Sequence, residues 1–418
     1  MTGPRGEYLE QIRRGGVALS PELAAAFASV PREAFVPDGF QRRDGTRVRP
    51  ADPEFLPAVY SDDVLVTKMD GRTPTSSSSQ PSLMAVMIEA LEVTPGLRVL
   101  EVGAGTGYNA ALLASLGASV TSIDVQKDVA VRARTALARA GIAGVRVEHA
   151  DGYTGLPEER FDRVIVTVGI AGVSPHWLEQ LSPDGFVLAP VVHAGTHPIL
   201  KVSRTNVSAP NVSHTNVGAP NVGAPNVGAP NVGLTNVSLP NVSDANVSDA
   251  NVRGPHVTGR PICAAGFMQA SGPLNADFPG AFPPPASALA ELTSYAPPRF
   301  DPPLTEGNYR DLWYAAGAWN RRASHAAVPG RQQSCLALLD RTGSAGAVIP
   351  PDGSVWAGGD EAEAYASLAA GILDDWVAAG RPPLQAWQVT LEPAGPIWVP
   401  SSYQVPDRRV RHGRPSGS

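Results

Sequence analysis

The sequence predicts an α/β protein with a Rossmann-like domain followed by a small C-terminal α+β module. Strand-like and helix-like segments alternate between residues 97 and 203, which is typical of a parallel sheet covered by helices. A glycine-rich turn follows the first of these strands. The composition then changes beyond residue 305, where six of the seven tryptophans lie. The expected sheet is mostly parallel, with one antiparallel hairpin at its end.

Each element of this domain is predicted from its apolar spacing. Strands are expected at 97–102, 119–123, 145–148, 162–168, 185–191 and 198–203, and helices at 107–116, 126–140 and 174–181. Apolar residues at helical spacing also predict a helix over 83–91, with Pro81 as a start signal. The serine run at 75–82 is expected to be a loop or a helix cap. Its position upstream of the glycine turn predicts that this helix begins beside a ligand.

The glycine turn contains Gly103, Gly105 and Gly107 at alternate positions. Glycine lets the backbone turn sharply and approach a ligand closely, and the following helix start offers free N–H groups. Asp124 ends the next expected strand, where a carboxylate typically accepts hydrogen bonds from ribose hydroxyls. The G-x-G-x-G spacing favours S-adenosylmethionine as the ligand. A nicotinamide site and a tight turn without a ligand are the alternatives.

Asp151 and Gly152 follow the third strand, and ligands gather at such strand ends. Asp151 is therefore a candidate acceptor for an adenine amino group, with a plain turn residue as the alternative.

The composition excludes several classes of protein. The 418 residues include 33 basic and 39 acidic side chains, so a net charge of −6 argues against non-specific nucleic-acid binding. Two cysteines support neither a disulfide framework nor a cysteine-based zinc site, and no metal site is expected. The absence of a long apolar run or secretion signal predicts a cytoplasmic protein without a membrane segment. The oligomeric state is left open.

An Asn-Val pair recurs every five residues from 206 to 251. This spacing resembles pentapeptide-repeat β-helices, but frequent prolines favour a low-complexity insertion over 206–258. Strand-like residues at 198–202 and 261–268 flank it, so we expect the insertion at the tip of an antiparallel hairpin.

The remaining boundaries follow from composition. The expected division is a helical cap with a serine-rich loop at 1–95, a cofactor-binding core at 96–205, a return strand at 259–275, a Pro-rich linker at 276–305, a module at 306–405 and a tail at 406–418. A helix over 361–379 and a strand over 384–391 are expected in the module. Its tryptophans are interpreted as core, with a peptide-binding surface as the alternative.

Four stretches together resemble the protein-L-isoaspartate O-methyltransferases. They are Val30–Pro37, Tyr60–Asp63, Ser77–Pro81 and Glu101–Tyr108, and the resemblance covers roughly residues 15–275 without the repeat. It implies a class I methyltransferase fold and S-adenosyl-L-methionine as the cofactor. It also assigns the active-site serine to Ser79, pocket-lining roles to Ser77 and Gln80, the pocket floor to the three glycines, the ribose contact to Asp124 and the adenine contact to Asp151 and Gly152.

The sequence departs from the family pattern where the substrate would bind. Ser77-Ser78 replaces Thr-Ile, Met84 stands where many relatives carry histidine, and the usual Gly-Gln-Gly lead-in is missing. These departures put the details of substrate contact in doubt more than cofactor binding.

The resemblance implies methyl transfer to the carboxyl of an isoaspartyl or aspartyl residue in a protein or peptide, giving a methyl ester and then a succinimide. A carboxylate is already ionised near pH 7, so no general base is required. One alternative is a tailoring methyltransferase that esterifies an aspartate in a ribosomally made, modified peptide. An alternative from another class is a non-catalytic binding scaffold.

Overall fold

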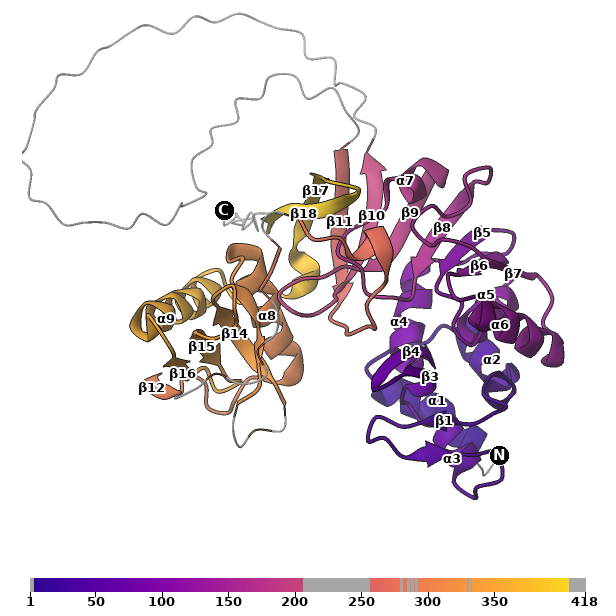
Figure 1. The fold of residues 1–418 in the computed structure, drawn as a ribbon, viewed down its shortest axis with the longest axis horizontal. Coiled ribbons are helices and arrows are strands. Elements are labelled where there is room, and N and C mark those ends of the chain that lie inside the picture. The colour runs from indigo at the N-terminus through magenta and orange to yellow at the C-terminus, as the bar shows by residue number, and fades with distance from the viewer. Residues whose placement is uncertain are drawn as a thin grey trace, which may run out of the picture. The chain divides into compact units, whose positions relative to one another are not determined.

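A nine-stranded sheet in the order β18-β17-β11-β10-β9-β8-β5-β6-β7 dominates the structure, a computed structural model (Figure 1). The structure describes residues 4–205, 256–278, 281–283, 286, 289, 292–328, 331 and 333–405. The predicted repeat and tail lie outside these residues. Among the described helices, none is both long enough and apolar enough to cross a membrane.

The parallel part of this sheet confirms the expected alternation of strands and helices. Its strands are β5 (Arg98–Val102), β6 (Ser119–Asp124), β7 (Val145–His149), β8 (Phe161–Val166) and β9 (Leu181–Pro190). The helices between them are α5 (Tyr108–Ser115), α6 (Lys127–Arg139) and α7 (Pro175–Gln180). Successive β5 residues Val99 and Leu100 belong to different apolar clusters because strand side chains alternate between the two faces.

Antiparallel strands extend the other side of the sheet. They are β10 (Ile199–Thr205), β11 (His256–Cys263), β17 (Gln388–Ala394) and β18 (Ile397–Gln404). β10 and β11 are neighbours, as the predicted hairpin requires. β17 and β18 differ from the expected division, which placed them in the separate module. Val389 and Leu391 are each 1% exposed and share a cluster with Val257 of β11, so burial of apolar surface draws these strands onto the main sheet.

The N-terminal region adds a four-stranded sheet and several helices. The strands are β2 (Arg47–Val48), β1 (Phe40–Gln41), β3 (Leu65–Asp70) and β4 (Thr73–Ser78), in that order. The helices are α1 (Pro4–Arg14), α2 (Pro21–Ser29), the 3-10 turn Arg32–Phe35, α3 (Phe55–Val59) and α4 (Pro81–Leu91). Residues 75–78 of the serine run therefore belong to a strand, where a loop or a helix cap was expected. Ser76 and Ser78 are buried on its inner face, and α4 begins at Pro81 as predicted.

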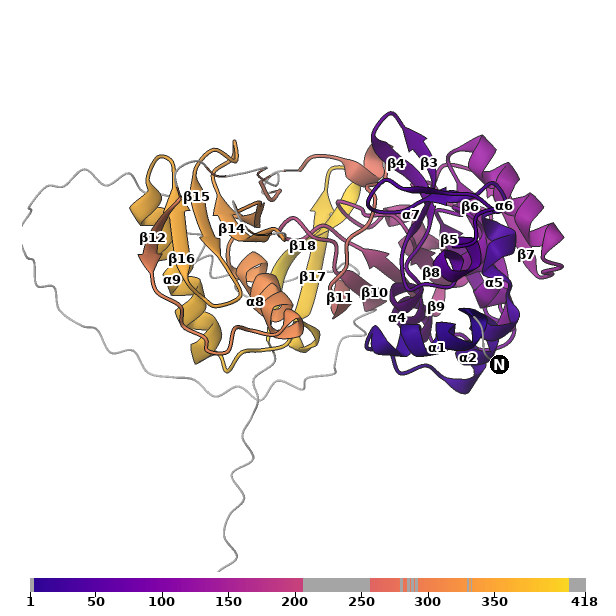
Figure 2. The ribbon, with the colours of Figure 1, turned by 90° about the horizontal axis from the view of Figure 1, so that it is seen from below.

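A second, five-stranded antiparallel sheet follows, with α8 and α9 beside it (Figure 2). Its elements are β12 (Thr293–Ala296), α8 (Glu306–Trp319), β13 (Ala323–Ala326), β14 (Cys335–Leu339), β15 (Gly346–Ile349), β16 (Val355–Gly358) and α9 (Ala362–Ala378). Two 3-10 turns, Gly272–Asn275 and Leu384–Ala386, lie outside the sheet. β12 comes from the expected linker. Trp376 and Trp387 are buried in this module's core, as interpreted, whereas Trp319 is 41% exposed.

Candidate active site

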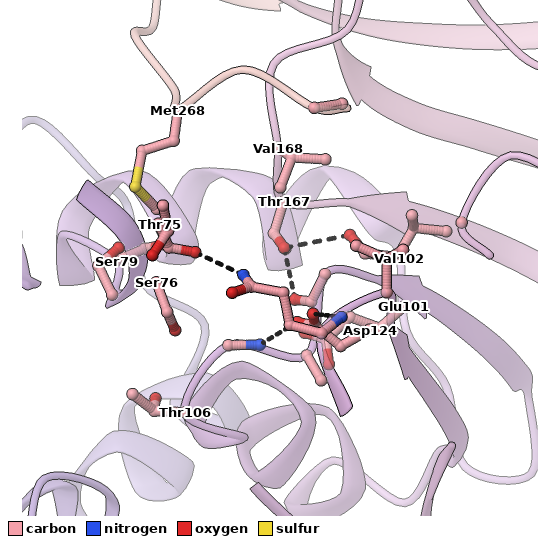
Figure 3. A pocket seen from close by; sticks show the side chains of 18 of the residues that line it. Thr75, Ser76, Ser79, Glu101, Val102, Thr106, Asp124, Thr167, Val168 and Met268 are labelled. Carbon is pink, nitrogen blue, oxygen red and sulfur yellow. Dashed lines mark hydrogen bonds between the residues drawn. The ribbon is translucent and has the colours of Figure 1, made fainter. Parts of the chain in front are cut away.

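A cavity of about 650 Å³ lies at the carboxyl ends of β5, β6 and β8 and beside β4 (Figure 3). We call it the inner cavity. Its lining comprises residues 73–79, 101–106, 123–126, 151–152, 167–168 and 268–271, with Met84, Tyr108, Asn109 and Leu274. The cavity therefore lies where a parallel sheet offers its ligand-binding edge. In Figure 3, Met268 projects from the segment after β11 towards Thr75 and Ser79.

The glycine turn leaves no room for side chains in this cavity. Gly103 has a φ of +99°, and a Cβ there would lie 2.6 Å from the Thr167 Oγ1. The Thr167 hydroxyl donates a hydrogen bond to the Gly103 carbonyl at 2.7 Å. A Cβ on Gly105 would meet the Ser77 carbonyl oxygen at 3.0 Å. The turn is thus fixed between β8 and the serine strand, with its backbone exposed to the cavity.

Gly107 has a different role from the other two glycines. It precedes α5 with a φ of +87° and is not among the lining residues. A Cβ there would approach the Ala133 carbonyl oxygen at 3.3 Å and the Leu137 side chain at 3.4 Å. Gly107 therefore permits close packing of α5 against α6, while Gly103 and Gly105 border the inner cavity.

Asp124 ends β6 inside the inner cavity, where it was predicted. Its Oδ1 accepts a hydrogen bond from the Gln126 backbone N–H at 2.9 Å, and its Oδ2 accepts one from the Gly105 N–H at 3.2 Å. The carboxyl is 9% exposed, and burial raises its pKa despite these two bonds. The backbone fixes the carboxylate, and each oxygen keeps a lone pair for a ligand.

Glu101 is a cavity residue to which the predictions assigned no role. The side chain is fully buried, and burial raises the pKa of its carboxyl to about 7. Asn109 Nδ2 donates to its Oε1 at 2.6 Å, and the Ser122 hydroxyl donates to its Oε2. The available signal in the sequence was one acid within the apolar run Val99–Val102.

Asp151 and Gly152 line the cavity beyond Asp124. Asp151 is exposed, and its Oδ1 accepts from the Tyr153 N–H at 3.0 Å. A Cβ on Gly152 would lie 2.8 Å from the Val102 Cγ1, and the Trp177 indole donates to the Gly152 carbonyl at 2.8 Å. The structure thus brings Asp151 and Gly152 to the same edge of the sheet as Asp124, at the carboxyl ends of the parallel strands.

Ser77 and Ser79 border the inner cavity and also a second cavity of about 1210 Å³, which we call the outer cleft. Pro74, Thr167 and Met268 line both as well. Neither serine hydroxyl has a hydrogen-bond partner among the described residues. Both hydroxyls therefore stay available to a ligand at the junction of the two spaces.

Gln80 was predicted to line the cofactor pocket, but its side chain faces elsewhere. Its Nε2 donates to Asp62 Oδ2 at 3.1 Å, and its Oε1 accepts from an Arg43 guanidinium nitrogen at 3.3 Å. Asp62 Oδ1 also accepts from the Ser82 N–H at 2.7 Å, in the first turn of α4. Gln80 borders the outer cleft and ties this helix start to the Tyr60–Asp63 segment.

Arg32 joins the motifs that are far apart in the sequence. It is fully buried, and its guanidinium donates to four backbone carbonyls at 2.8–3.0 Å: those of Val59, Ser61, Asp63 and Ser79. The resemblance includes Arg32 in the Val30–Pro37 stretch, but the sequence did not indicate this role. Arg32 is a positioning residue that holds the backbone of Ser79 against the Tyr60–Asp63 segment.

Two polar atoms of the inner cavity lack partners. Thr75 Oγ1 and Asn109 Oδ1 are buried with no hydrogen-bond partner among the described residues. Such atoms are costly unless a ligand or water satisfies them. Together with the open glycine backbone, they fit a polar ligand in this cavity.

Comparisons with known proteins identify the family of this chain. Residues 5–217 match the family model of protein-L-isoaspartate(D-aspartate) O-methyltransferase. A protein-L-isoaspartate O-methyltransferase of Gloeobacter violaceus is 37% identical over 183 residues, which cover 44% of this chain and 79% of the relative. One of Methanoculleus marisnigri is 38% identical over 189 residues, covering 45% and 76%.

Solved structures are also similar. A protein-L-isoaspartate O-methyltransferase structure matches 95% of this chain and 99% of its own, with a TM-score of 0.49 and 21% identity. A Plasmodium falciparum structure of the same description, in complex with S-adenosyl-L-homocysteine, covers 49% and 92%, with a TM-score of 0.39 and 16% identity. The family model and the relatives show that this chain belongs to the protein-L-isoaspartate(D-aspartate) O-methyltransferase family.

Proposed function

We propose that this protein transfers a methyl group from S-adenosyl-L-methionine to the side-chain or isoaspartyl carboxylate of a protein or peptide. One observation carries the proposal: an acid-lined cavity with an open glycine backbone meets a second cleft at Ser79. Membership of the family supports the same conclusion.

The residues of the inner cavity fit this cofactor in charge and hydrogen bonding. S-adenosylmethionine carries a sulfonium and an ammonium group besides its carboxylate. The cavity's described lining contains Glu101, Asp124 and Asp151 but no Lys, Arg or His. We assign the ribose hydroxyls to Asp124, the adenine edge to Asp151 and Gly152, and the methionine part to the Gly103–Gly105 backbone and Glu101. The free Asn109 and Thr75 oxygens can accept further hydrogen bonds.

The proposed chemistry requires orientation more than proton transfer. When bound, the cofactor supplies a methyl group that is already electrophilic. The incoming carboxylate is ionised at neutral pH, so the chain must hold its oxygen in line and keep water away. Ser79 can donate a hydrogen bond to the other carboxylate oxygen, with Ser77 beside it. Met268, which lines both spaces, and Met84, which lines the inner cavity, are apolar residues that can limit the entry of water.

A peptide series tests this proposal directly. Four peptides of one sequence carry isoaspartate, aspartate, asparagine or alanine at the acceptor position, and the full chain is incubated with each and the cofactor. Mass spectrometry should find one methyl group on an acidic peptide and none on the asparagine and alanine controls. Methylation of all four peptides, or of none, would contradict carboxyl methylation. Methylation of the aspartyl peptide alone would exclude isoaspartate as the acceptor.

The tailoring function is a second candidate because residues beyond the family match reach the outer cleft. Glu306 and Arg310 of the C-terminal module line it, and both lie outside the residues 5–217 that match the family model. A cyclised, ribosomally made peptide should be methylated at least about tenfold faster than its linear form if this function is correct. The scaffold alternative predicts no S-adenosyl-L-homocysteine binding in calorimetry, even at high protein concentration.

A further inference from the structure

Positively charged side chains are concentrated in the outer cleft. Five arginines line it: Arg14, Arg42, Arg43, Arg72 and Arg310. Its acidic lining residues are Asp44 and Glu306. The whole chain, in contrast, carries a net charge of −6. The excess of arginine is thus a local property of this cleft.

Three of these arginines form no ion pair with a described residue, and one of the three, Arg14, donates to the Glu10 carbonyl of its own helix. Arg43 forms an ion pair with Asp63, and Arg310 with Glu306. Arg42 and Arg72 form no ion pair with any described residue. Asp44, which also lines the cleft, accepts from the Thr46 N–H at 2.8 Å, and this bond and, to a smaller extent, the charge of Arg42 lower the pKa of its carboxyl. A guanidinium without a carboxylate partner, held at a cleft, is a suitable ligand for a substrate carboxylate.

Arg42 and Arg72, two of the arginines without an ion pair, line the same cleft as Ser79. Arg42 follows β1, and Arg72 lies in the turn between β3 and β4, at the opposite end of β4 from Ser79. Ser77, Ser79 and Pro74 line the same cleft as both arginines. A peptide that places one carboxylate at Ser79 and extends along this cleft can therefore bring its flanking residues to these guanidinium groups.

The C-terminal module supplies a further wall of this cleft. α8 carries Arg310 and contacts the segment that follows β9. The Trp313 indole of α8 donates to the Ala194 carbonyl at 2.8 Å. The Tyr314 carbonyl of α8 lies 2.8 Å from His193 Nε2. Gln385 donates to the Ile262 carbonyl of β11 at 3.1 Å. These contacts hold Arg310 at the cleft, where a peptide carboxylate could replace Glu306 as its partner.

We propose that the outer cleft selects acidic peptides, binding carboxylates that flank the methylated residue through Arg42 and Arg72, with Arg310 of the C-terminal module as a further contact. This inference rests on the proposed methyl transfer. It adds a substrate class: acceptor residues embedded in an acidic segment.

Three acceptor peptides that differ only in their flanks test this inference. Each has the same acceptor residue between two Glu, two Gln or two Lys on either side. The wild-type protein should show a KM for the Glu peptide about tenfold below that for the Gln peptide, with similar kcat, and this preference should weaken with salt. The Lys peptide should have the highest KM.

Arginine variants identify the residues responsible. Arg42→Gln combined with Arg72→Gln should raise KM about five- to tenfold for the Glu peptide only. Arg42→Glu with Arg72→Glu should reverse the order of the Glu and Lys peptides. Arg310→Gln should raise KM for the Glu peptide by a smaller factor, about twofold. Arg160→Gln is the matched control, because Arg160 is exposed, lines neither cavity and contacts only nearby carbonyls.

A binding measurement distinguishes failure of the methyl-transfer proposal from failure of the charge-selection proposal. It uses the same peptides and the protein loaded with S-adenosyl-L-homocysteine. If no peptide is methylated but the Glu peptide binds most tightly through Arg42 and Arg72, methyl transfer fails and the charge selection stands. If the peptides are methylated with equal KM and bind equally, the charge selection is overturned and methyl transfer stands. An equal loss for all three peptides in the double Gln variant would also overturn it.

Discussion

The two cavities that meet at Ser79 carry opposite charges. The inner cavity is lined by Glu101, Asp124 and Asp151, and the outer cleft by five arginines and two acids. Charged groups of one sign attract ligands of the other, so the pair suits a cationic cofactor on one side and an anionic peptide on the other. One serine strand serves as the wall between them.

The two cavities also differ in how firmly their charges are held. Glu101 and Asp124 are buried and hydrogen-bonded, whereas Arg42 is half-buried and Arg72 exposed. Buried groups interact strongly and in one geometry, while exposed guanidinium groups interact weakly and adapt. The inner cavity should therefore bind one compound, and the outer cleft a range of acidic sequences.

Replacing Arg32, which holds the backbone of Ser79 between the two cavities, should have the largest effect. Arg32→Met leaves the carbonyls of Val59, Ser61, Asp63 and Ser79 without their donor. We expect a loss of about 3 kcal/mol or more in the free energy of unfolding, together with loss of activity. Chemical denaturation measures the first. Arg47→Met is the control, since exposed Arg47 donates to a single carbonyl, and an equal loss there would contradict the account.

Two glycine variants distinguish a glycine that borders the inner cavity, Gly103, from one that permits helix packing, Gly107. Gly103→Ala forces a Cβ against Thr167 at a positive φ, so S-adenosyl-L-homocysteine affinity should fall at least about a hundredfold. Gly107→Ala should instead lower the melting temperature and leave affinity within about threefold, because its Cβ meets α6. Calorimetry and thermal unfolding of both variants measure this difference. A loss of affinity in Gly107→Ala and a loss of melting temperature alone in Gly103→Ala would contradict these assignments.

Asp124→Asn tests the inner cavity's charge. Replacing a carboxylate that accepts from ribose hydroxyls should weaken S-adenosyl-L-homocysteine binding about ten- to a hundredfold, with a smaller change in kcat. Equilibrium dialysis measures the affinity. Asp162→Asn is the control because Asp162 pairs with Arg98 outside both cavities. Unchanged affinity in Asp124→Asn would remove the ribose assignment.

Ser79→Ala tests the junction. The loss of one hydrogen bond to the acceptor carboxylate should lower kcat about tenfold while cofactor affinity stays within about twofold. Ser115→Ala is the control, since the Ser115 hydroxyl bonds only its own helix at 2.8 Å. Equal losses in kcat and in cofactor affinity would place Ser79 in the cofactor site instead.

The smallest expected effect is a pH dependence. Since burial raises the pKa of Glu101 to about 7, this carboxyl is mostly protonated below that pH. A bound ammonium group favours the ionised form, so cofactor affinity should rise by up to about tenfold between pH 6 and 8, about fivefold of it below pH 7, and then level off. Calorimetry across this range should show a flat profile for Glu101→Gln. A rise of the same size in that variant would exclude Glu101 as the cause.

The raised pKa of Glu101 also affects the free energy of unfolding. This stability falls as the pH rises, whereas cofactor affinity increases. The unfolded carboxyl releases its proton near its ordinary pKa of 4.5, before the folded one does. The ligand-free protein should therefore lose stability from Glu101 as the pH rises from about 4.5 to about 7. Below pH 4.5 both states are protonated, and the loss is absent.

The parts of the site that follow from local sequence could be predicted. The turn at Gly103–Gly107 and the acid ending β6 depend on a strand, a turn and a helix that adjoin in the chain. The helix start at Pro81 depends on local signals as well. The sequence signals for each of these elements lie within about twenty residues of one another.

The rest depends on contacts between distant residues, which one sequence does not reveal. Arg32 meets Ser79 across 47 positions, and β17 joins β11 although more than a hundred residues separate them. Gln80 turned away from the cavity because Asp62 and Arg43 both bind its amide. The serine run became a strand because β3 pairs with it, and Arg310 reaches the outer cleft only through packing of α8.

The most direct test of the account is the position of the methyl group on the product. An isoaspartyl peptide with an acidic flank is incubated with the full chain and methyl-labelled S-adenosyl-L-methionine, and fragments are sequenced by mass spectrometry. The account predicts one label, on the acceptor carboxyl, and its absence with Gly103→Ala. Label on a nitrogen or a flanking residue, or none despite measured cofactor binding, would contradict it.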